Sequence, residues 1–174
     1  QPTLRLGALP LTLADVRGTS QSDAWAGFAS FAELAAAAQP TQRLTIQFAA
    51  PTAFAQSSSA GHERVALLPD PQTLFGGLLR RWNALAPAEL QLEQAAIEQS
   101  AYRALVSSYD LHTVRYGVGK ALQIGFLGSC SYRLIGTPEE QRQLALLADA
   151  AFYLGVGKKT TRGMGMCRRL PDEW

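Results

Sequence analysis

Alternating apolar and polar residues predict the strands of this chain. Leu44, Ile46 and Phe48 fall on one face of residues 43–50 and most polar side chains fall on the other, as expected of a strand with one buried face. The longest alternation has three glycines in it or beside it, which indicates a bulge or a close approach of another backbone segment. The predicted strands span residues 43–50, 109–116, 122–134 and 166–170, with a hairpin turn at 117–120.

Two helices are predicted from apolar residues at helical spacing. The first follows Pro69-Asp70-Pro71 and is closed by Pro87. The second begins with Thr137 as N-cap and Pro138 in its first turn, and Gly155 can end it with a positive φ. The predicted buried stripes are Leu74, Leu78, Leu79, Trp82 and Leu85 in the first helix, and Leu144, Leu147, Ala148, Ala151 and Leu154 in the second.

Prolines and weaker patterns predict the remaining structure. Pro51 is expected to end the strand before it, because proline has no N–H for a central ladder. Leucines from Leu4 to Leu13 predict extended segments that are broken at Pro10. Weaker patterns predict a short helix at 28–38, helical structure at 90–104 and a flexible loop at 55–63.

From residue 43 onward, the predicted order is strand, helix, strand, strand, helix, strand. This is the order of a ferredoxin-like (RRM-like) α+β fold, with a four-stranded antiparallel sheet and its helices on one face. In that topology the last strand pairs with the first, and Cys130 and Cys167 lie on non-adjacent strands. Both are therefore predicted to be reduced. We expect a domain at 41–174, preceded at 1–40 by an extension or by the remnant of another domain.

Composition narrows the class of protein. The 174 residues are 47% hydrophobic and 17% charged, which excludes a disordered chain. The formal net charge is only +2, but residues 152–171 hold five basic side chains and no acidic one. The sequence begins at Gln1 and its two methionines are Met164 and Met166, as expected of a trimmed end or of a fragment of a longer protein.

The segment from Gly155 to Gly165 has the strongest chemical signature. Four glycines, three cations and two threonine hydroxyls fall within this stretch, and glycines allow successive amides to point into one concavity. These features predict a clamp for backbone phosphates, with a long solvated turn as the alternative. A nucleotide P-loop is excluded because Phe152 replaces its first glycine and Lys159 its Ser or Thr, and a dinucleotide fingerprint is excluded by Thr160.

The same segment, with the preceding helix, resembles the C-terminal signature of the CRISPR-associated Cas6 endoribonucleases. The matching stretch reads LADAAFYLGVGKKTTRGMG from Leu147 to Gly165. Supporting matches are Phe48–Phe54, which resembles the family's strand ending in Pro-Thr, and the helix that contains Leu74-Phe75 and Arg81-Trp82-Asn83. The strand motif Gly125-Phe-Leu-Gly128, continuing to Tyr132, also matches, so the resemblance covers about residues 40–170.

This resemblance implies two tandem ferredoxin-like domains that bind CRISPR repeat RNA and cut it without a metal. The 2′-hydroxyl attacks the neighbouring phosphate and leaves a cyclic phosphate. The general base or acid is usually a histidine of the first domain, so we expect the catalytic residue to lie outside this chain. The RNA-binding residues implied are Gly155, Gly157, Lys158, Lys159, Thr160, Thr161, Arg162, Gly163 and Gly165.

The resemblance, together with the lack of a long apolar run and of metal-ligand spacing in the sequence, sets expectations about ligands, partners and location. We expect repeat RNA as the ligand, no cofactor, no metal, no membrane and a cytoplasmic location. Further partners are a missing N-terminal domain, a second copy or other CRISPR-associated proteins. Two other functions stay open: a non-catalytic RNA-binding subunit of a CRISPR effector complex, and an unrelated α/β domain that binds a phosphorylated metabolite.

For the other polar and aromatic candidates, a purely structural role is weighed against a role in catalysis or RNA binding. His62 is read as a solvated loop residue, and His112 as a partly buried strand residue, rather than as catalytic groups. Arg80 and Arg81 are placed on the solvated side of a helix, and Tyr132 in the core. In the functional interpretation, basic residues on or near the hairpin extend a basic track from the 155–165 segment, and tyrosines stack on unpaired bases. The basic residues are Arg115, Lys120 and Arg133, and the tyrosines are Tyr109 and Tyr116.

Overall fold

The computed structural model describes residues 2–56, 64–118 and 121–171. Contacts divide the chain into two units, Gln1–Ser30 and Phe31–Trp174, so residues 31–40 belong with the second unit. In the first unit, β1 (Thr3–Leu6) pairs antiparallel with β2 (Leu9–Thr12). Pro10 lies inside β2, so the prediction that it breaks the extended segment is wrong. A two-stranded ladder has only edge strands, where the missing N–H of proline is tolerated.

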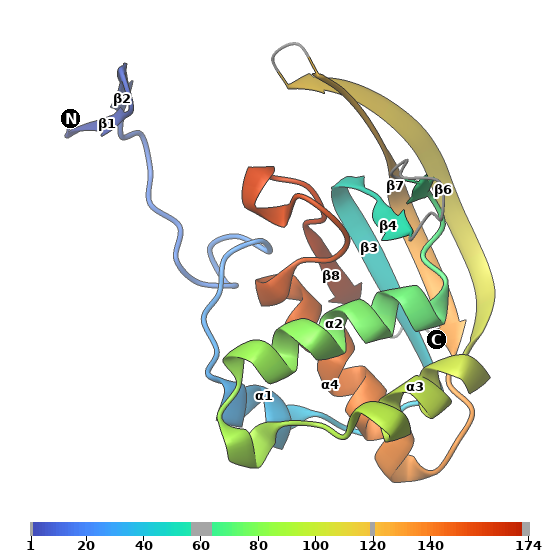
Figure 1. Ribbon diagram of the computed structural model, residues 1–174. Helices are drawn as coiled ribbons and strands as arrows, with labels where there is room; N and C mark the ends of the chain where they lie inside the picture. The colour runs from blue at the N-terminus through green and yellow to red at the C-terminus, as the bar shows by residue number, and fades with distance from the viewer. Residues whose placement is uncertain (1, 57–63, 119–120, 172–174) are drawn as a thin grey trace. The chain divides into compact units, whose positions relative to one another are not determined.

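The second unit contains a four-stranded antiparallel sheet with the order β6-β7-β3-β8 (Figure 1). The first predicted strand therefore lies between the second strand of the hairpin and the last strand, which confirms the ferredoxin-like topology. The bounds are Arg43–Thr52 for β3, Leu105–Val118 for β6, Ala121–Arg133 for β7 and Cys167–Leu170 for β8.

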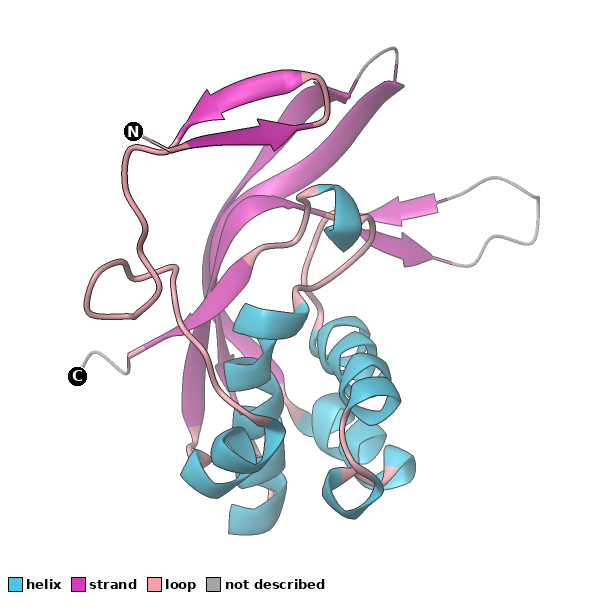
Figure 2. Cartoon of the chain, turned by 90° about the vertical axis from the view of Figure 1, so that its left-hand side faces the viewer, coloured by secondary structure: helices cyan, strands magenta, loops and turns pink. Residues whose placement is uncertain are grey.

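Helices cover one face of this sheet (Figure 2). The α-helices are α1 (Phe31–Ala37), α2 (Pro71–Leu85), α3 (Gln94–Arg103) and α4 (Pro138–Leu154). Short elements complete the chain: the hairpin β4 (Phe54–Gln56) and β5 (Arg64–Ala66), and the single 3₁₀ turns η1 (Ala88–Leu90) and η2 (Thr160–Arg162).

Both long helices begin where their capping residues predict. The Asp70 side chain accepts a hydrogen bond from the amide of Thr73 at 3.0 Å. At the start of α4, the Thr137 hydroxyl accepts from the Glu140 amide at 3.3 Å, and the Glu140 carboxylate accepts from the Thr137 amide at 2.7 Å. This reciprocal capping box satisfies two amides that have no partner within the helix.

The core lies between the sheet and the helices. Leu44, Ile46 and Phe48 of β3 are fully buried, and Phe75 joins the predicted stripe of α2. Leu85 is 64% exposed, which corrects the predicted stripe: α2 ends there, so no further turn covers the side chain. The residues of the two predicted stripes that are buried are Leu74, Leu78, Leu79, Trp82, Leu144, Leu147, Ala148 and Ala151.

Several element bounds differ from the sequence-based expectation. β3 continues through Pro51 to Thr52, because a register shift after Phe48 puts the proline where the ladder is interrupted. The helix expected at 28–38 begins only at Phe31, and the helix within the stretch expected at 90–104 is α3, which begins at Gln94 after the turn η1 has ended at Leu90. The expected loop at 55–63 is flanked by the β4–β5 hairpin, while residues 57–63 lie outside the described residues.

The two cysteines are buried free thiols on strands that do not pair with each other, as predicted. Cys130 lies on β7 and Cys167 on β8, with β3 between them. Burial raises the pKa of both thiols, and that of Cys167 reaches about 12. Each therefore stays protonated at neutral pH and packs as a small apolar side chain.

Candidate RNA-binding site

The glycine-rich loop, residues 155–165, joins α4 to β8. Phe48 pairs with Cys167 at the start of β8, and Thr52 pairs with Phe126 of β7, so three strands meet beside this loop. We call this side of the sheet the loop end. The β6–β7 hairpin continues past the loop end and past the helices as a two-stranded arm (Figure 1).

Backbone hydrogen bonds fix the base of the glycine-rich loop. The amide of Val156 donates to the carbonyl of Gly165 at 2.9 Å and closes the loop. The amide of Lys158 donates to Ala53 at 2.8 Å, and that of Gly165 donates to Pro51 at 3.1 Å, which joins the loop to the end of β3. These amides already have protein partners, so the expectation that they form a phosphate cradle is not met at these positions.

Glycine is required at two points of this base because the backbones approach closely. A Cβ on Gly165 would lie 1.9 Å from the carbonyl oxygen of Val156, and one on Gly157 would lie 2.4 Å from that of Ala53. Both residues also have positive φ, 72° and 73°. Val156 and Met164, each 2% exposed, add apolar contacts. The glycines therefore allow the loop to dock closely.

The polar side chains at the tip of the loop have at least partial access to solvent. Thr161 and Arg162 are exposed, while Lys158, Lys159 and Thr160 are partly exposed. Lys159 has a φ of 58°, the one positive value among the described non-glycine residues. Its ammonium donates to the side-chain oxygen of Gln123 on the β6–β7 arm. A short 3₁₀ turn, η2, therefore presents cations and hydroxyls at a position tied to both α4 and β7.

Arg81 is the residue of this site that the sequence analysis misplaced. Its guanidinium donates to the carbonyl of Leu154 at 3.3 Å and also to the carbonyls of Gly155 and Gly157. It is therefore turned toward the loop and partly buried, and desolvation lowers its pKa. Helical spacing carried a signal: residue 81 lies seven positions after Leu74 and three after Leu78, on the edge of the apolar stripe.

The remaining histidine and tyrosine candidates differ in whether their side chains are exposed or buried. His112 is exposed, which corrects its predicted partial burial: it pairs with Leu127, on the face of the sheet opposite to the buried Phe126. Tyr109 is 66% exposed, whereas Tyr132 is buried as predicted and donates to the carbonyl of Pro69 at 2.8 Å. His62 lies outside the described residues, and the structure describes only the backbone of Tyr116.

The arginines outside the loop do not form one continuous track. Arg115 is exposed on the β6–β7 arm, near the loop end. Arg133 pairs with Leu105 and Arg43 at the opposite end of β7, seven residues beyond Phe126 or roughly 23 Å at the rise of a strand. It therefore cannot extend a track from the loop. Lys120 lies outside the described residues.

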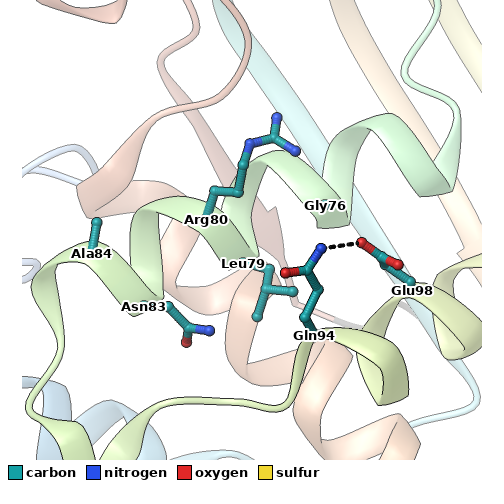
Figure 3. A pocket seen from close by; sticks show the side chains of 7 residues that line it. All are labelled: Gly76, Leu79, Arg80, Asn83, Ala84, Gln94 and Glu98. Atoms are coloured by element: carbon teal, nitrogen blue, oxygen red, sulfur yellow. Dashed lines mark hydrogen bonds between the residues drawn. The ribbon is translucent and has the colours of Figure 1, made fainter.

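A separate pocket of about 320 Å³ lies between α2 and α3 (Figure 3). On its α3 side, the side chain of Gln94 donates to the carboxylate of Glu98 at 2.7 Å. Its lining carries one cation, Arg80, and one carboxylate, Glu98, so it has no net positive charge to attract a polyanion and is a poor candidate for RNA. Its lining residues are Gly76, Leu79, Arg80, Asn83, Ala84, Gln94 and Glu98.

Two further features bear on the kind of site. The described residues contain no cluster of three or more His, Cys, Asp or Glu side chains that could hold a metal ion. In the same part of the chain, every helix is too short or too polar to cross a membrane.

Solved structures similar to this chain include two Cas6 complexes. The product complex of a Thermus thermophilus Cas6 protein is 34% identical, with a TM-score of 0.87 over 97% of this chain and 65% of the other. The substrate-mimic complex of a second Cas6 protein is 29% identical, with a TM-score of 0.79 over 97% of this chain and 68% of the other.

Curated relatives point to the same family. The CRISPR-associated endoribonuclease Cas6 of Mycobacterium tuberculosis is 27% identical over 153 residues, which are 88% of this chain and 47% of the relative. That of Streptococcus thermophilus is 22% identical over 121 residues, or 70% of this chain and 48% of the relative. The chain thus spans about half the length of these relatives. The family model of the CRISPR-associated endoribonuclease Cas6 matches residues 46–167, so the chain belongs to the Cas6 family.

Proposed function

We propose that this chain is the C-terminal, RNA-binding domain of an endoribonuclease that processes CRISPR repeat RNA. The observation that carries the proposal is the glycine-rich loop, whose cations and hydroxyls are exposed or partly exposed at a place fixed by hydrogen bonds to the end of β3 and to α2. Its similarity to Cas6 structures that are product and substrate-mimic complexes supports RNA as the ligand.

In the proposed binding mode, side chains of the loop contact the RNA backbone. Lys158, Lys159 and Arg162 meet phosphate oxygens, and the hydroxyls of Thr160 and Thr161 donate hydrogen bonds to them. Such contacts position the RNA without specifying its sequence. The glycines at 155, 157, 163 and 165 contribute by shaping the loop, since close packing at its base requires them.

In the proposed reaction of the full-length enzyme, a ribose 2′-hydroxyl attacks the adjacent phosphate. The products carry a cyclic phosphate and a 5′-hydroxyl, and no metal takes part. We assign no catalytic residue to this chain and propose that the general base or acid comes from another part of the enzyme. The cations of the loop hold the strand so that the attacking and leaving oxygens stay aligned.

Cleavage of labelled repeat RNA by the full-length protein in EDTA tests this function. We expect a single cut that leaves a cyclic phosphate, and no cut when the attacking nucleotide carries a 2′-deoxyribose. A protein that binds the repeat RNA but never cuts it, with or without Mg²⁺, would instead be a non-catalytic RNA-binding subunit. A cut that requires Mg²⁺ would contradict the proposed chemistry.

A further inference from the structure

The contacts of Arg81 join the glycine-rich loop to the end of α4. Its Nη1 donates to the carbonyls of Leu154 and Gly155, and its Nη2 donates to that of Gly157. One planar group therefore bridges the last turn of the helix and the first turn of the loop. Lysine has no comparable geometry, since its donors all sit on one atom, whereas a guanidinium fork reaches acceptors on two sides.

Electrostatics explain why a cation is placed here. The carbonyls at the C-terminus of a helix carry the negative end of the helix dipole, and α4 is 17 residues long. Gly155 leaves the helix with a φ of 63°, so its carbonyl and that of Gly157 have no helical partners. Arg81 supplies hydrogen bonds to these carbonyls and offsets their negative charge, which compensates for its own partial burial.

The loop has a physical need for such a support. Lys158, Lys159 and Arg162 repel one another, and four glycines give the segment a large conformational entropy when it is not held. A loop that is ordered before RNA binds loses less entropy on binding, so its affinity is higher.

We infer that Arg81 is a positioning residue for RNA binding: its guanidinium holds residues 154–157 so that the loop is ordered before the RNA arrives. This inference rests on the function proposed above. In this role Arg81 contacts no phosphate itself: its hydrogen bonds go to the carbonyls of Leu154, Gly155 and Gly157. Its effect passes through Lys158, Lys159 and Arg162.

The test compares Arg81→Gln and Arg81→Lys with the wild-type chain and with Arg80→Gln. Arg80 is a matched control, because it is the preceding residue of α2, is exposed and makes no hydrogen bond or ion pair with another described residue. Amide hydrogen exchange is measured without RNA at Val156, Lys158 and Gly165, whose amides donate hydrogen bonds at the loop base. Amides in the middle of β7 report global unfolding.

For Arg81→Gln we expect loop exchange at least about tenfold faster, with the β7 amides still protected. Binding of a fluorescein-labelled repeat RNA weakens by about tenfold at constant salt, while its salt dependence keeps the wild-type slope, since every phosphate ligand is still present. Arg81→Lys keeps the charge but not the fork, so its loop exchanges almost as fast as that of Arg81→Gln. Arg80→Gln behaves as wild type.

Unchanged loop exchange in Arg81→Gln overturns the inference, and so does a lower salt slope, which would make Arg81 a phosphate ligand. If Arg81→Gln does not fold, Arg81→Lys decides, and wild-type loop exchange in that variant overturns the role of the fork. Failure of the proposed function gives a different result from failure of this inference. In that case the wild-type chain does not bind the repeat RNA, although amide exchange still shows whether Arg81 orders the loop.

Discussion

At the scale of single residues, three consecutive side chains of α2 have three different roles. Arg81 contacts the glycine-rich loop, whereas Trp82 is fully buried and donates to the carbonyl of Leu90 at 2.8 Å. Asn83 forms a reciprocal pair of hydrogen bonds with the backbone of Leu92, at 2.8 and 2.9 Å. This one helical turn therefore links the loop, the core and the connection to α3.

Gly165 offers a test of the close packing at the loop base. Gly165→Ala forces a Cβ to within 1.9 Å of the carbonyl oxygen of Val156, so the backbone has to move. We expect a loss of roughly 1–3 kcal/mol in the free energy of unfolding, measured in urea. The control is Gly163→Ala, because Gly163 also has a positive φ but nothing lies within 4 Å of its Cβ position. Equal losses in the two variants would refute the packing explanation.

The thiol of Cys167 makes stability depend on alkaline pH. Burial raises its pKa from 9.0 to about 12, so between these values the unfolded chain loses the proton while the folded chain keeps it. The free energy of unfolding from this group is therefore unchanged below about pH 9 and falls as pH rises toward 12. Urea unfolding at pH 8 and pH 10.5 should show a larger drop for the wild type than for Cys167→Ala; equal drops would contradict the assignment.

At the scale of elements, α4 links the core to the glycine-rich loop. Its N-terminus is fixed by the capping box, its middle is buried on the sheet, and its C-terminal carbonyls contact Arg81. The position of the loop therefore depends on α4 together with the end of β3 and Arg81 of α2. A change at the capped end is expected to lower stability without altering the loop's side chains.

Thr137 tests this division of roles. Thr137→Ala removes the hydroxyl that accepts from the Glu140 amide, so we expect a loss of about 1 kcal/mol in the free energy of unfolding. Thr137→Ser keeps the hydroxyl and should stay close to wild type. The affinity of the folded Thr137→Ala variant for repeat RNA should not change. A clear loss of affinity would show that the two ends of α4 are coupled.

The sequence alone predicted the elements that carry local signals, namely capping residues and apolar–polar alternation. Threonine and proline at the start of α4 and glycine at its end predict its bounds, because capping acts within a few residues. Alternating apolar and polar residues predict β3 and β7, because one-sided burial repeats every second residue. The continuation of β3 through Pro51 was missed, since it depends on a bulge against β7. The exposure of Leu85 depends on where α2 ends relative to its neighbours. For Arg81, helical spacing put the residue at the edge of the apolar stripe, but its partners on the loop come from the tertiary structure.

At the scale of the whole molecule, the fold places the candidate RNA contacts at one end of the sheet. The residues of the loop were found from composition and from the family resemblance. The docking of the loop was not, because it rests on hydrogen bonds to Pro51, Ala53 and Arg81, which lie far earlier in the sequence. The sequence therefore predicts which groups take part, and the tertiary structure determines how they are held.

The central claim is that the loop's cations bind RNA phosphates, and the salt dependence of affinity tests it most directly. The dissociation constant of a labelled repeat RNA is measured against salt concentration for the wild type, for Gln123→Ala and for the chain with Lys158, Lys159 and Arg162 all replaced by alanine. Gln123→Ala removes the partner of Lys159 but no cation, so it serves as the control.

For the triple variant, our account predicts weaker binding and a slope of log K against log salt that is flatter by about 0.7 for each phosphate that is no longer neutralised. The control should keep the wild-type slope. A triple variant with the affinity and the slope of the wild type would contradict the account, because the RNA would then be held elsewhere on the molecule.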